Sequence, residues 1–271
     1  MSARAFIKKR LISRAPNKLT PCAGMGSGME RQMRPFFSYF GSKYRLARQL
    51  YPAPTHDTII EPFAGSACYS VVNNAPSVLL NDVDPIICAV WSFLIRSTPR
   101  CIMSLPLIEP GQDVANLGVC QEAQWFIGFW LNKATSSPNR KLSAWSLKYP
   151  QQFWGEHKRQ QIAKQVNAIN HWQISNKQFY QLENQTACWF IDPPYQVAGK
   201  NYRCGTKGID YAQLGAWCAS RKGQLIVCEN EGADWLPFSG ATVLRNARNK
   251  GTKEVAYVSN GKQANLFGAK I

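Results

Sequence analysis

The stretch Trp189-Phe190-Ile191-Asp192-Pro193-Pro194-Tyr195 decides the fold, because it combines an apolar strand with an abrupt end. The three apolar residues predict a buried strand, and the two prolines end it and leave carbonyls without neighbouring amide donors. Asp192 is therefore expected at the carboxyl end of a strand, where open α/β sheets bind their ligands. A carboxylate, an exposed carbonyl and the ring of Tyr195 suit a planar group that carries an NH2. The same residues equally fit a strand end, a Pro-Pro turn and a packed tyrosine.

A strand, tight loop and helix are predicted upstream, over Thr58-Ile59-Ile60-Glu61-Pro62-Phe63-Ala64-Gly65-Ser66-Ala67. Gly65 lets the backbone approach a ligand closely, as in nucleotide-binding turns. The next strand, Val78-Leu79-Leu80, ends in Asn81-Asp82, seventeen residues after Gly65, where an acid can bind both ribose hydroxyls. The alternative is an aspartate that caps a helix or turn. A full Gly-x-Gly-x-x-Gly is missing, which favours a single adenosyl group over a dinucleotide.

An aromatic segment precedes both units, in Pro35-Phe36-Phe37-Ser38-Tyr39-Phe40-Gly41-Ser42-Lys43, and leads into a predicted helix over 44–50. Such a segment suits a small-ligand pocket, with the helix amides and Lys43 available to a carboxylate. An aromatic strand followed by a turn is an equally good interpretation of these residues alone.

The remaining segments alternate between helix and strand, which predicts an α/β fold. Helices are expected over 84–95, 121–132, 156–170 and 212–221, strands over 172–174 and 223–228, and a closing β-hairpin from 241–244 and 254–258. Between residues 98 and 152 the periodicity weakens, and this part is expected to be an insertion.

The chain is strongly basic, with a net charge of +16 over 271 residues, so a polyanion is the expected partner and nucleic acid the leading one. Basic residues interleave with aromatic ones in the insertion and recur at the hairpin tip, a pattern that grips a nucleic-acid backbone, although solvated surface loops would look similar. The predicted contacts are Lys133, Arg140, Lys141, Lys148, Arg245, Arg248, Lys250 and Lys253. No apolar run is long enough to span a bilayer, and no basic amphipathic helix is clear, so no membrane partner is expected.

Residues 1–34 differ from the rest, with eight Lys or Arg against the single acid Glu30. They predict a disordered basic arm that touches phosphates, although an organelle transit peptide or a start-codon artefact would look the same. Without them the chain retains 24 basic and 15 acidic residues, a net charge of +9. The folded part is therefore basic by itself.

The nine cysteines form no Cys-x-x-Cys pair, and the three histidines are far apart in the sequence. Neither a disulfide framework nor a metal site is predicted, and reduced core cysteines indicate a cytoplasmic setting.

Taken together, the order aromatic Gly-Ser-Lys, Glu-Pro-Phe-Ala-Gly-Ser, Asn-Asp, insertion and Asp-Pro-Pro-Tyr closely resembles the Dam-type (alpha-group, D12 class) DNA adenine N6-methyltransferases. The resemblance covers about residues 35–262. The chain departs from the family pattern at Tyr39, where tryptophan is usual, at Ser42, where glycine is usual, and at Ala67-Cys68, where a second glycine is missing.

The resemblance implies a Rossmann-like methyltransferase fold, with a mixed seven-stranded sheet, helices on both faces and S-adenosylmethionine as methyl donor. Residues 35–97 and 153–262 would form the catalytic domain, 98–152 a small target-recognition region for a short or relaxed sequence, and 263–271 a tail. Tyr39 and Lys43 would border the methionine moiety, Asp82 the ribose, and Val83 and Phe179 the adenine. The implied cofactor-binding residues are Tyr39, Gly41, Lys43, Glu61, Pro62, Phe63, Gly65, Ser66, Asp82, Val83, Phe179 and Asp192.

The implied activity is transfer of a methyl group to the N6 amine of an adenine flipped out of DNA, with Asp192, Pro193, Pro194 and Tyr195 as catalytic residues. The enzyme would work in the cytoplasm, on the nucleoid when bound to DNA, in a restriction-modification or phage-like setting. The alternatives are RNA adenine, cytosine N4 (for which Ser usually replaces the Asp), or a nucleic-acid-binding protein without catalysis. The sequence does not indicate an oligomeric state.

Overall fold

A computed structural model describes residues 32–133, 135–196, 203, 208–245 and 251–260 of the chain. Most of the predicted basic arm, the tail at 263–271 and the predicted nucleic-acid contacts Arg248 and Lys250 lie outside these residues. The division into arm, catalytic domain, recognition region and tail stays a prediction.

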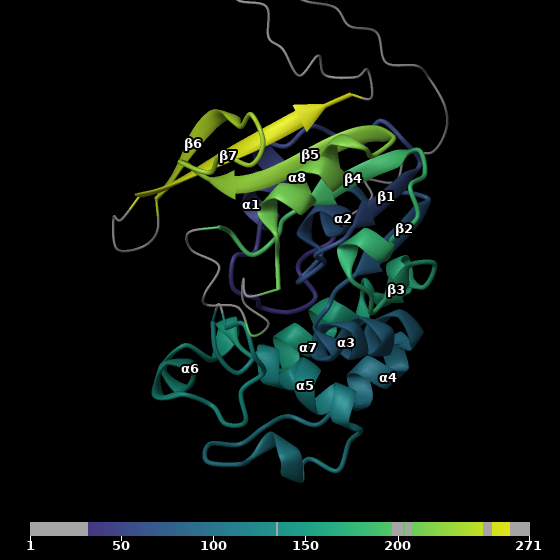
Figure 1. Cartoon of the computed structure of the whole chain (residues 1–271). Coiled ribbons are helices and arrows are strands. Elements are labelled where there is room, and N and C mark those ends of the chain that lie inside the picture. Colours follow the sequence, from purple (N-terminus) through teal and green to yellow (C-terminus); the bar gives the residue numbers. More distant parts are fainter. Residues whose placement is uncertain (1–31, 134, 197–202, 204–207, 246–250, 261–271) are drawn as a thin grey trace, which may run out of the picture. The chain divides into compact units, whose positions relative to one another are not determined.

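The strands form one sheet of seven in the order β3-β2-β1-β4-β5-β7-β6 (Figure 1). All neighbours from β3 to β5 are parallel, and β7 runs antiparallel to both β5 and β6. The strands are β1 (Thr58–Glu61), β2 (Ser77–Asn81), β3 (Gln173–Ser175), β4 (Ala187–Ile191), β5 (Gly223–Asn230), β6 (Ser239–Arg245) and β7 (Gly251–Ser259). The predicted mixed α/β fold is confirmed, and the closing hairpin is β6 and β7.

Strand β4 lies in the centre of the sheet and is buried along its whole length. Its side chains alternate between two hydrophobic clusters: Cys188 and Phe190 belong to the larger one, Trp189 and Ile191 to the smaller one. Because successive side chains of a strand point to opposite faces, an uninterrupted apolar run fits a strand that is covered on both sides.

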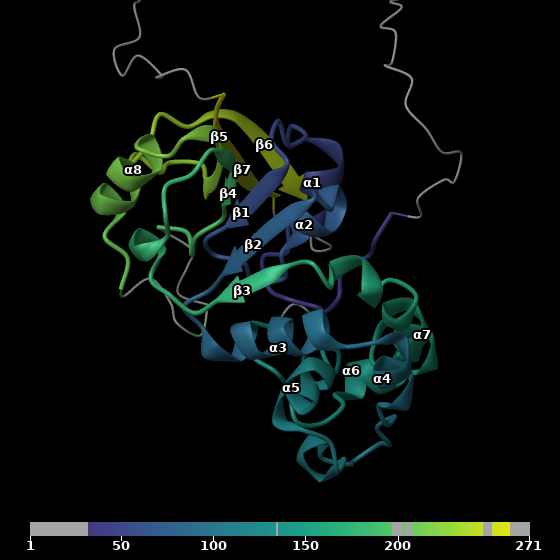
Figure 2. The same ribbon diagram turned by 90° about the vertical axis from the view of Figure 1, so that its right-hand side faces the viewer.

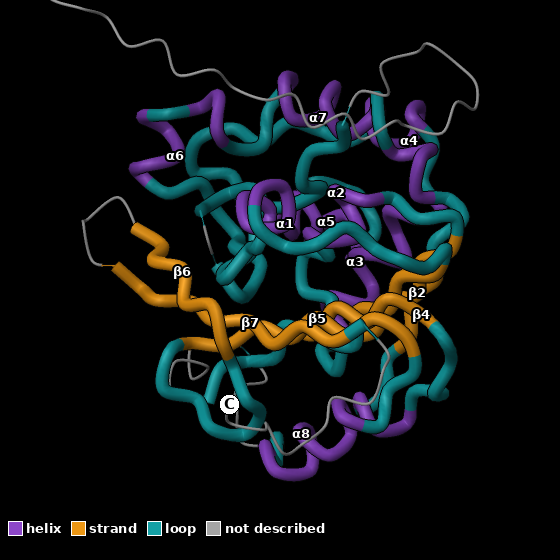
Figure 3. The backbone as a smooth tube through the Cα atoms, turned by 90° about the horizontal axis from the view of Figure 1, so that it is seen from above, coloured by secondary structure: helices purple, strands orange, loops and turns teal. Residues whose placement is uncertain are grey.

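Helices cover both faces of the sheet, as Figure 3 shows. Helices α1 (Tyr44–Gln49), α2 (Cys68–Asn73) and α3 (Pro85–Arg96) pack into the larger cluster, and α8 (Tyr211–Ala219) packs into the smaller one. Asp84 starts α3 by accepting a hydrogen bond from the amide of Ile86, with Pro85 in the first turn, where its missing N–H costs nothing.

The predicted insertion contains helices and continues the larger cluster through Phe126, Phe129 and Trp130. Helix α5 packs on α3 and α4 on α7, and together they form a helical lobe beside the sheet (Figures 1 and 2). The lobe consists of α4 (Pro99–Ser104), η1 (Val114–Asn116), α5 (Gln121–Phe129), α6 (Ala144–Lys148), η2 (Pro150–Gln152), α7 (Glu156–Ala163) and η3 (Val166–Ile169).

The helix predicted over 156–170 is interrupted, because α7 ends at Ala163 and the 3-10 helix η3 follows. Gln165, between the two, leaves helical geometry, and its side-chain amide pairs with both backbone polar groups of Arg34, at 2.9 and 2.7 Å. This tertiary contact has no signature in the helical periodicity. The fourth 3-10 helix, η4 (Phe179–Gln181), follows β3. Among the described residues, no helix is long and apolar enough to cross a membrane.

Candidate active site

One pocket lies at the carboxyl ends of β1, β2 and β4, and its open space, counting the mouth, is about 1060 Å³. Every residue predicted to bind the cofactor lines it: Tyr39, Gly41, Lys43, Glu61, Pro62, Phe63, Gly65, Ser66, Asp82, Val83, Phe179 and Asp192. Of the other residues predicted to be catalytic, Pro194 lines the pocket as well, whereas Pro193 and Tyr195 are not part of its lining. Segments far apart in the sequence thus meet at one edge of the sheet, as parallel strands require.

The loop after β1 has the tight geometry that its glycine predicted. Gly65 has a φ of +46°, and a Cβ there would lie 3.0 Å from the ring of Tyr39. Its carbonyl accepts a hydrogen bond from Trp91 Nε1 at 2.8 Å, which anchors the loop to α3. Two residues later, Ala67 also has a positive φ, 45°, although it carries a side chain. The left-handed conformation thus persists where this chain lacks the second glycine.

Asp82 joins the first two loops of the pocket. Its Oδ2 accepts a hydrogen bond from the Gly65 amide and its Oδ1 one from the Asp84 amide, both at 2.9 Å. Burial disfavours the charged form and raises the pKa of Asp82 to about 6. Each carboxylate oxygen has a second lone pair, so these bonds leave acceptor capacity for a ligand hydroxyl.

Glu61, at the end of β1, accepts a hydrogen bond from the Ser70 amide of α2 at 2.8 Å. This is one of the unpaired amides of the first helical turn. Burial raises the pKa of Glu61 to about 8. The carboxyl therefore fixes α2 against β1 beneath the pocket.

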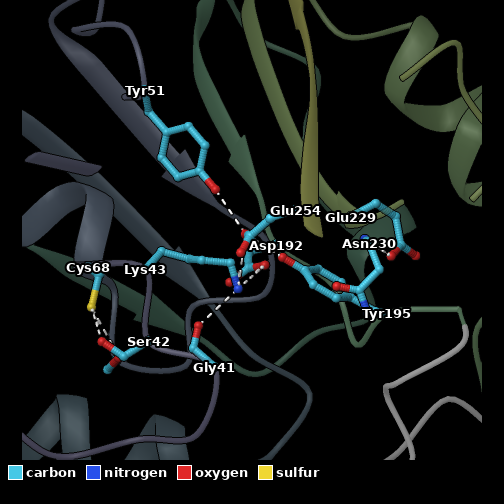
Figure 4. A network of polar contacts seen from close by, with 11 residues as sticks. Gly41, Ser42, Lys43, Tyr51, Cys68, Asp192, Tyr195, Glu229, Asn230 and Glu254 are labelled. Atoms are coloured by element: carbon cyan, nitrogen blue, oxygen red, sulfur yellow. Dashed lines mark hydrogen bonds and ion pairs between the residues drawn. The ribbon is translucent and has the colours of Figure 1, made fainter. Parts of the chain in front are cut away.

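The centre of the site is a polar network around Asp192 (Figure 4). The ammonium of Lys43 lies 3.1 Å from Asp192 Oδ1 and 3.5 Å from Glu254 Oε1, and it donates to the Gly41 carbonyl at 2.9 Å. Burial raises the pKa of Asp192 to about 6, against the opposing effect of the Lys43 charge. The Lys43 ammonium thus lies at the Asp192 end of the pocket, and its contact with a methionine moiety stays a prediction.

Side chains from β5, β7 and α8 fix the turn after β4. The Tyr195 hydroxyl donates to Glu254 Oε1 at 2.6 Å, and the Lys43 ammonium lies 4.7 Å from the Tyr195 ring centre. The Tyr211 hydroxyl donates to the Pro194 carbonyl at 2.5 Å, and the Gln196 amide donates to Glu229 Oε1 at 2.7 Å. The turn is therefore anchored at the second proline, the tyrosine and the residue that follows.

Comparison with known protein families supports the motif-based assignment. Residues 39–116 match the family model of the D12 class N6 adenine-specific DNA methyltransferases. The D12 match contains the Gly-Ser-Lys segment, the β1 loop and Asp82, and it ends before Asp192. The fold brings Asp192 and Pro194 to this pocket from outside the matched range.

Among solved structures, the chain is similar to the rRNA methyltransferase AviRa from Streptomyces viridochromogenes, at 13% identity over 83% of this chain and 87% of that one. The TM-score is 0.36, so this similarity carries no argument about substrate. No curated protein sequence matches the chain.

Several residues of this site were not predicted from the sequence. Glu254 on β7, Glu229 on β5, Tyr211 on α8 and Tyr51 after α1 each contribute a hydrogen bond to the network or to the turn. Glu229 and Glu254 could have been found from one signal, an acid within or directly after an apolar strand. Such an acid is expected to be buried, and a buried carboxylate requires polar partners.

A group of possible metal ligands also lies here: Asp192, Cys228 and Glu254 have ligand atoms within 4.8 Å of one another. The Lys43 ammonium pairs with both carboxylates and thereby already supplies a positive charge to the group.

The predicted nucleic-acid contacts lie in different surroundings. Lys141 and Lys148 are exposed on the helical lobe. Arg140 pairs with both oxygens of Asp113, at 3.1 and 2.8 Å, and Lys253 pairs with Glu231 at 2.8 Å, so a local acid already balances each charge. Arg245 is in β6, and its side chain is outside the described part of the structure.

Lys158 has two cationic neighbours that the sequence did not connect. Burial lowers the pKa of Lys158, and the positive charges of Arg34 and Lys133 nearby lower it further. The Lys158 ammonium lies 4.7 Å from the ring centre of Trp130, and its hydrogen bond goes to the neutral Gln161 side chain. Three segments of the chain thus bring a basic cluster, Arg34, Lys133 and Lys158, to one place on the helical lobe.

Proposed function

We propose that the protein transfers a methyl group from S-adenosylmethionine to the N6 amine of an adenine in DNA. One observation carries the proposal: Asp192, at the end of β4, lines the same pocket as the Gly65 loop and Asp82 of the D12 segment. An acceptor for an amine and the features of an adenosyl-binding site therefore face one space.

The lining suits S-adenosylmethionine in shape and charge. Phe63, Val83 and Phe179 supply apolar surface for an adenine ring, and the rings of Phe63 and Phe179 lie 5.7 Å apart. Asp82 offers acceptor capacity beside them. Acidic groups also suit the positive sulfonium and amino groups of the cofactor. When bound, the cofactor would supply a methyl group activated by its sulfonium.

The chain's own residues would orient the target base. Asp192 and the Pro193 carbonyl can each accept one hydrogen of the N6 amine, which favours a pyramidal nitrogen with its lone pair directed at the methyl group. Tyr195 can stack on the flipped purine. Such alignment contributes much of the rate in a direct transfer, and it needs no covalent intermediate on the enzyme. Asp192 acts as an orienting acceptor.

DNA is the proposed substrate because the D12 family acts on it and because the chain is basic. Base flipping costs a few kcal/mol, and backbone contacts by the basic cluster of the helical lobe could offset part of that cost. Residues 98–152 are the proposed target-recognition region, for a short or relaxed DNA sequence.

The test uses the full chain, labelled S-adenosylmethionine and, separately, unmethylated DNA and RNA, followed by mass spectrometry of the nucleosides. The expected product is N6-methyladenine in DNA, absent with Asp192→Ala. Label in RNA alone would replace DNA by RNA as substrate. Cofactor binding without any methylated base would overturn the enzymatic proposal.

A further inference from the structure

Glu254 is a carboxylate of the site with three polar partners, and neither the motifs nor the D12 match includes it. It belongs to β7, where it is buried and lies opposite Asn230 of β5 and Thr242 of β6. A buried carboxylate is costly unless its charge is paired and hydrogen-bonded. The hydrogen bonds and the ion pair of Glu254 therefore indicate its role in the site.

All of those contacts converge on one oxygen. Glu254 Oε1 accepts the Tyr195 hydroxyl at 2.6 Å and the Tyr51 hydroxyl at 3.0 Å, and it lies 3.5 Å from the Lys43 ammonium (Figure 4). Two of these partners, Tyr195 and Lys43, are also the neighbours of Asp192. Glu254 thus contacts the neighbours of Asp192 from β7, which is the last strand in the described part of the chain and lies far from the Asp192 motif in sequence.

The charges do not balance within the network. Lys43 offers one positive charge to two carboxylates, with distances of 3.1 Å to Asp192 Oδ1 and 3.5 Å to Glu254 Oε1. An ammonium has three N–H donors, and here a third acceptor is the Gly41 carbonyl. Without Glu254, Asp192 would face the full charge of Lys43 with no second carboxylate to share it, and Lys43 would compete with a target amine for the lone pairs of Asp192.

We propose that Glu254 is a positioning residue, which fixes Lys43 and Tyr195 around Asp192 and draws part of the Lys43 charge away from it. The proposal rests on the proposed methyltransferase function. Asp192 then stays available as an acceptor for the N6 amine, and the Tyr195 ring is held by its hydroxyl in one plane for stacking. Glu254 acts through these two residues and touches no substrate.

The surroundings of Asp192 make this role measurable. The charged or titratable groups that face it are Lys43, Glu254, Tyr195, Tyr51, Cys228, Glu61 and Cys68. Among them, Lys43 lowers the pKa of Asp192 and Glu254 raises it. Removal of the Glu254 charge therefore favours ionised Asp192 and shifts the acid limb of the pH–rate profile to lower pH.

The decisive variant is Glu254→Gln, which keeps the shape of the side chain and removes its charge. We expect kcat to fall about tenfold or more, because the acceptor and the stacking ring lose their alignment. The acid limb should move down by about one pH unit. The dissociation constant for S-adenosylmethionine should stay within about twofold. Glu254→Asp should recover part of kcat and return the acid limb towards that of the wild type.

Two further variants keep the proposal falsifiable. Glu231→Gln removes an exposed acid that pairs with Lys253, and Lys253 is the residue directly before Glu254 in β7. This variant should change neither kcat nor the acid limb. Tyr51→Phe removes one hydrogen bond from Glu254 and leaves its charge, which should strengthen its hold on Lys43. The acid limb of Tyr51→Phe should move to higher pH, in the direction opposite to that of Glu254→Gln. If Glu254→Gln does not fold, the shift in Tyr51→Phe tests the proposal in its place.

The outcomes separate the two proposals. An inactive wild type refutes the proposed function itself. An active wild type with an unchanged kcat in Glu254→Gln, or with a lower kcat but an unmoved acid limb and no recovery in Glu254→Asp, overturns the positioning role. In the latter case Glu254 would only stabilise the hairpin.

Discussion

Asp192 combines three properties that an acceptor for an amine needs. It is fixed at the end of a fully buried strand, it lines the pocket, and its negative charge is balanced by Lys43 only in part, since Glu254 shares that ammonium. We expect Asp192→Ala to abolish methylation, and we expect S-adenosylmethionine binding to stay within about threefold of the wild type, because the other lining residues remain. Single-turnover methylation and calorimetric binding check the two parts. Turnover near the normal rate would remove Asp192 from the mechanism.

The raised pKa of Asp192 predicts the pH dependence of the reaction. The ionised carboxylate is the form that accepts hydrogen bonds from both N–H donors and neighbouring cations, and with a pKa of about 6 it dominates only above that pH. Activity should therefore rise about tenfold per unit below pH 6 and level off above pH 7. A stopped assay between pH 5 and 8 at saturating substrates checks this. A flat profile across pH 6 would show that the ionisation of Asp192 does not control the rate.

At the scale of the element, the turn between β1 and α2 carries strain that a different residue would relieve. Ala67 adopts a left-handed conformation, which costs an L-residue about 1–2 kcal/mol, whereas glycine adopts it freely but loses more chain entropy on folding. Ala67→Gly should therefore stabilise the protein by up to about 1 kcal/mol. Ala64→Gly, in the same loop but without a positive φ, should destabilise it by a similar amount. Urea denaturation of both variants tests the argument, and equal destabilisation would contradict it.

The link between β1 and α2 also has a pH signature. Burial raises the pKa of Glu61 to about 8, so the folded state keeps its proton between about pH 4.5 and 8, where the unfolded chain releases it. The folded state binds more protons in this window, and its stability falls as pH rises through it. Glu61→Gln keeps an acceptor for the Ser70 amide and should flatten this dependence. Melting temperatures measured from pH 5 to 8 check the result, and parallel curves for variant and wild type would contradict it.

At the scale of the whole molecule, the helical lobe places Arg34, Lys133 and Lys158 together. If this basic cluster contacts phosphates, Lys133→Ala with Lys158→Ala should weaken DNA binding on any sequence and reduce the slope of log K against log salt by about 2. Lys222→Ala, an exposed lysine directly before β5, is the matched control and should leave the slope unchanged. Binding titrations at several salt concentrations decide, and an unchanged slope in the double variant would exclude the cluster from the interface.

Local patterns in the sequence predicted most of the elements. Strand β4 was recognisable from an apolar run that two prolines end, the β1 loop from Gly65, and α3 from its Asp-Pro start. These signals are local because strand termination, positive φ and helix capping depend on a few neighbouring residues. The same residues also carried the family resemblance, and the part of it within residues 39–116 is confirmed by the D12 match.

Only the tertiary structure decided which distant segments contact one another in the site and in the helical lobe. No local pattern indicated that Glu254 contacts Lys43 and Tyr195, because β7 meets the site only once it pairs antiparallel with β5. Nor could periodicity show that α7 ends where Gln165 binds Arg34, or that Lys133 approaches Lys158. Contacts between distant segments depend on strand order and on the packing of the lobe, and neither is encoded in any short stretch of the chain.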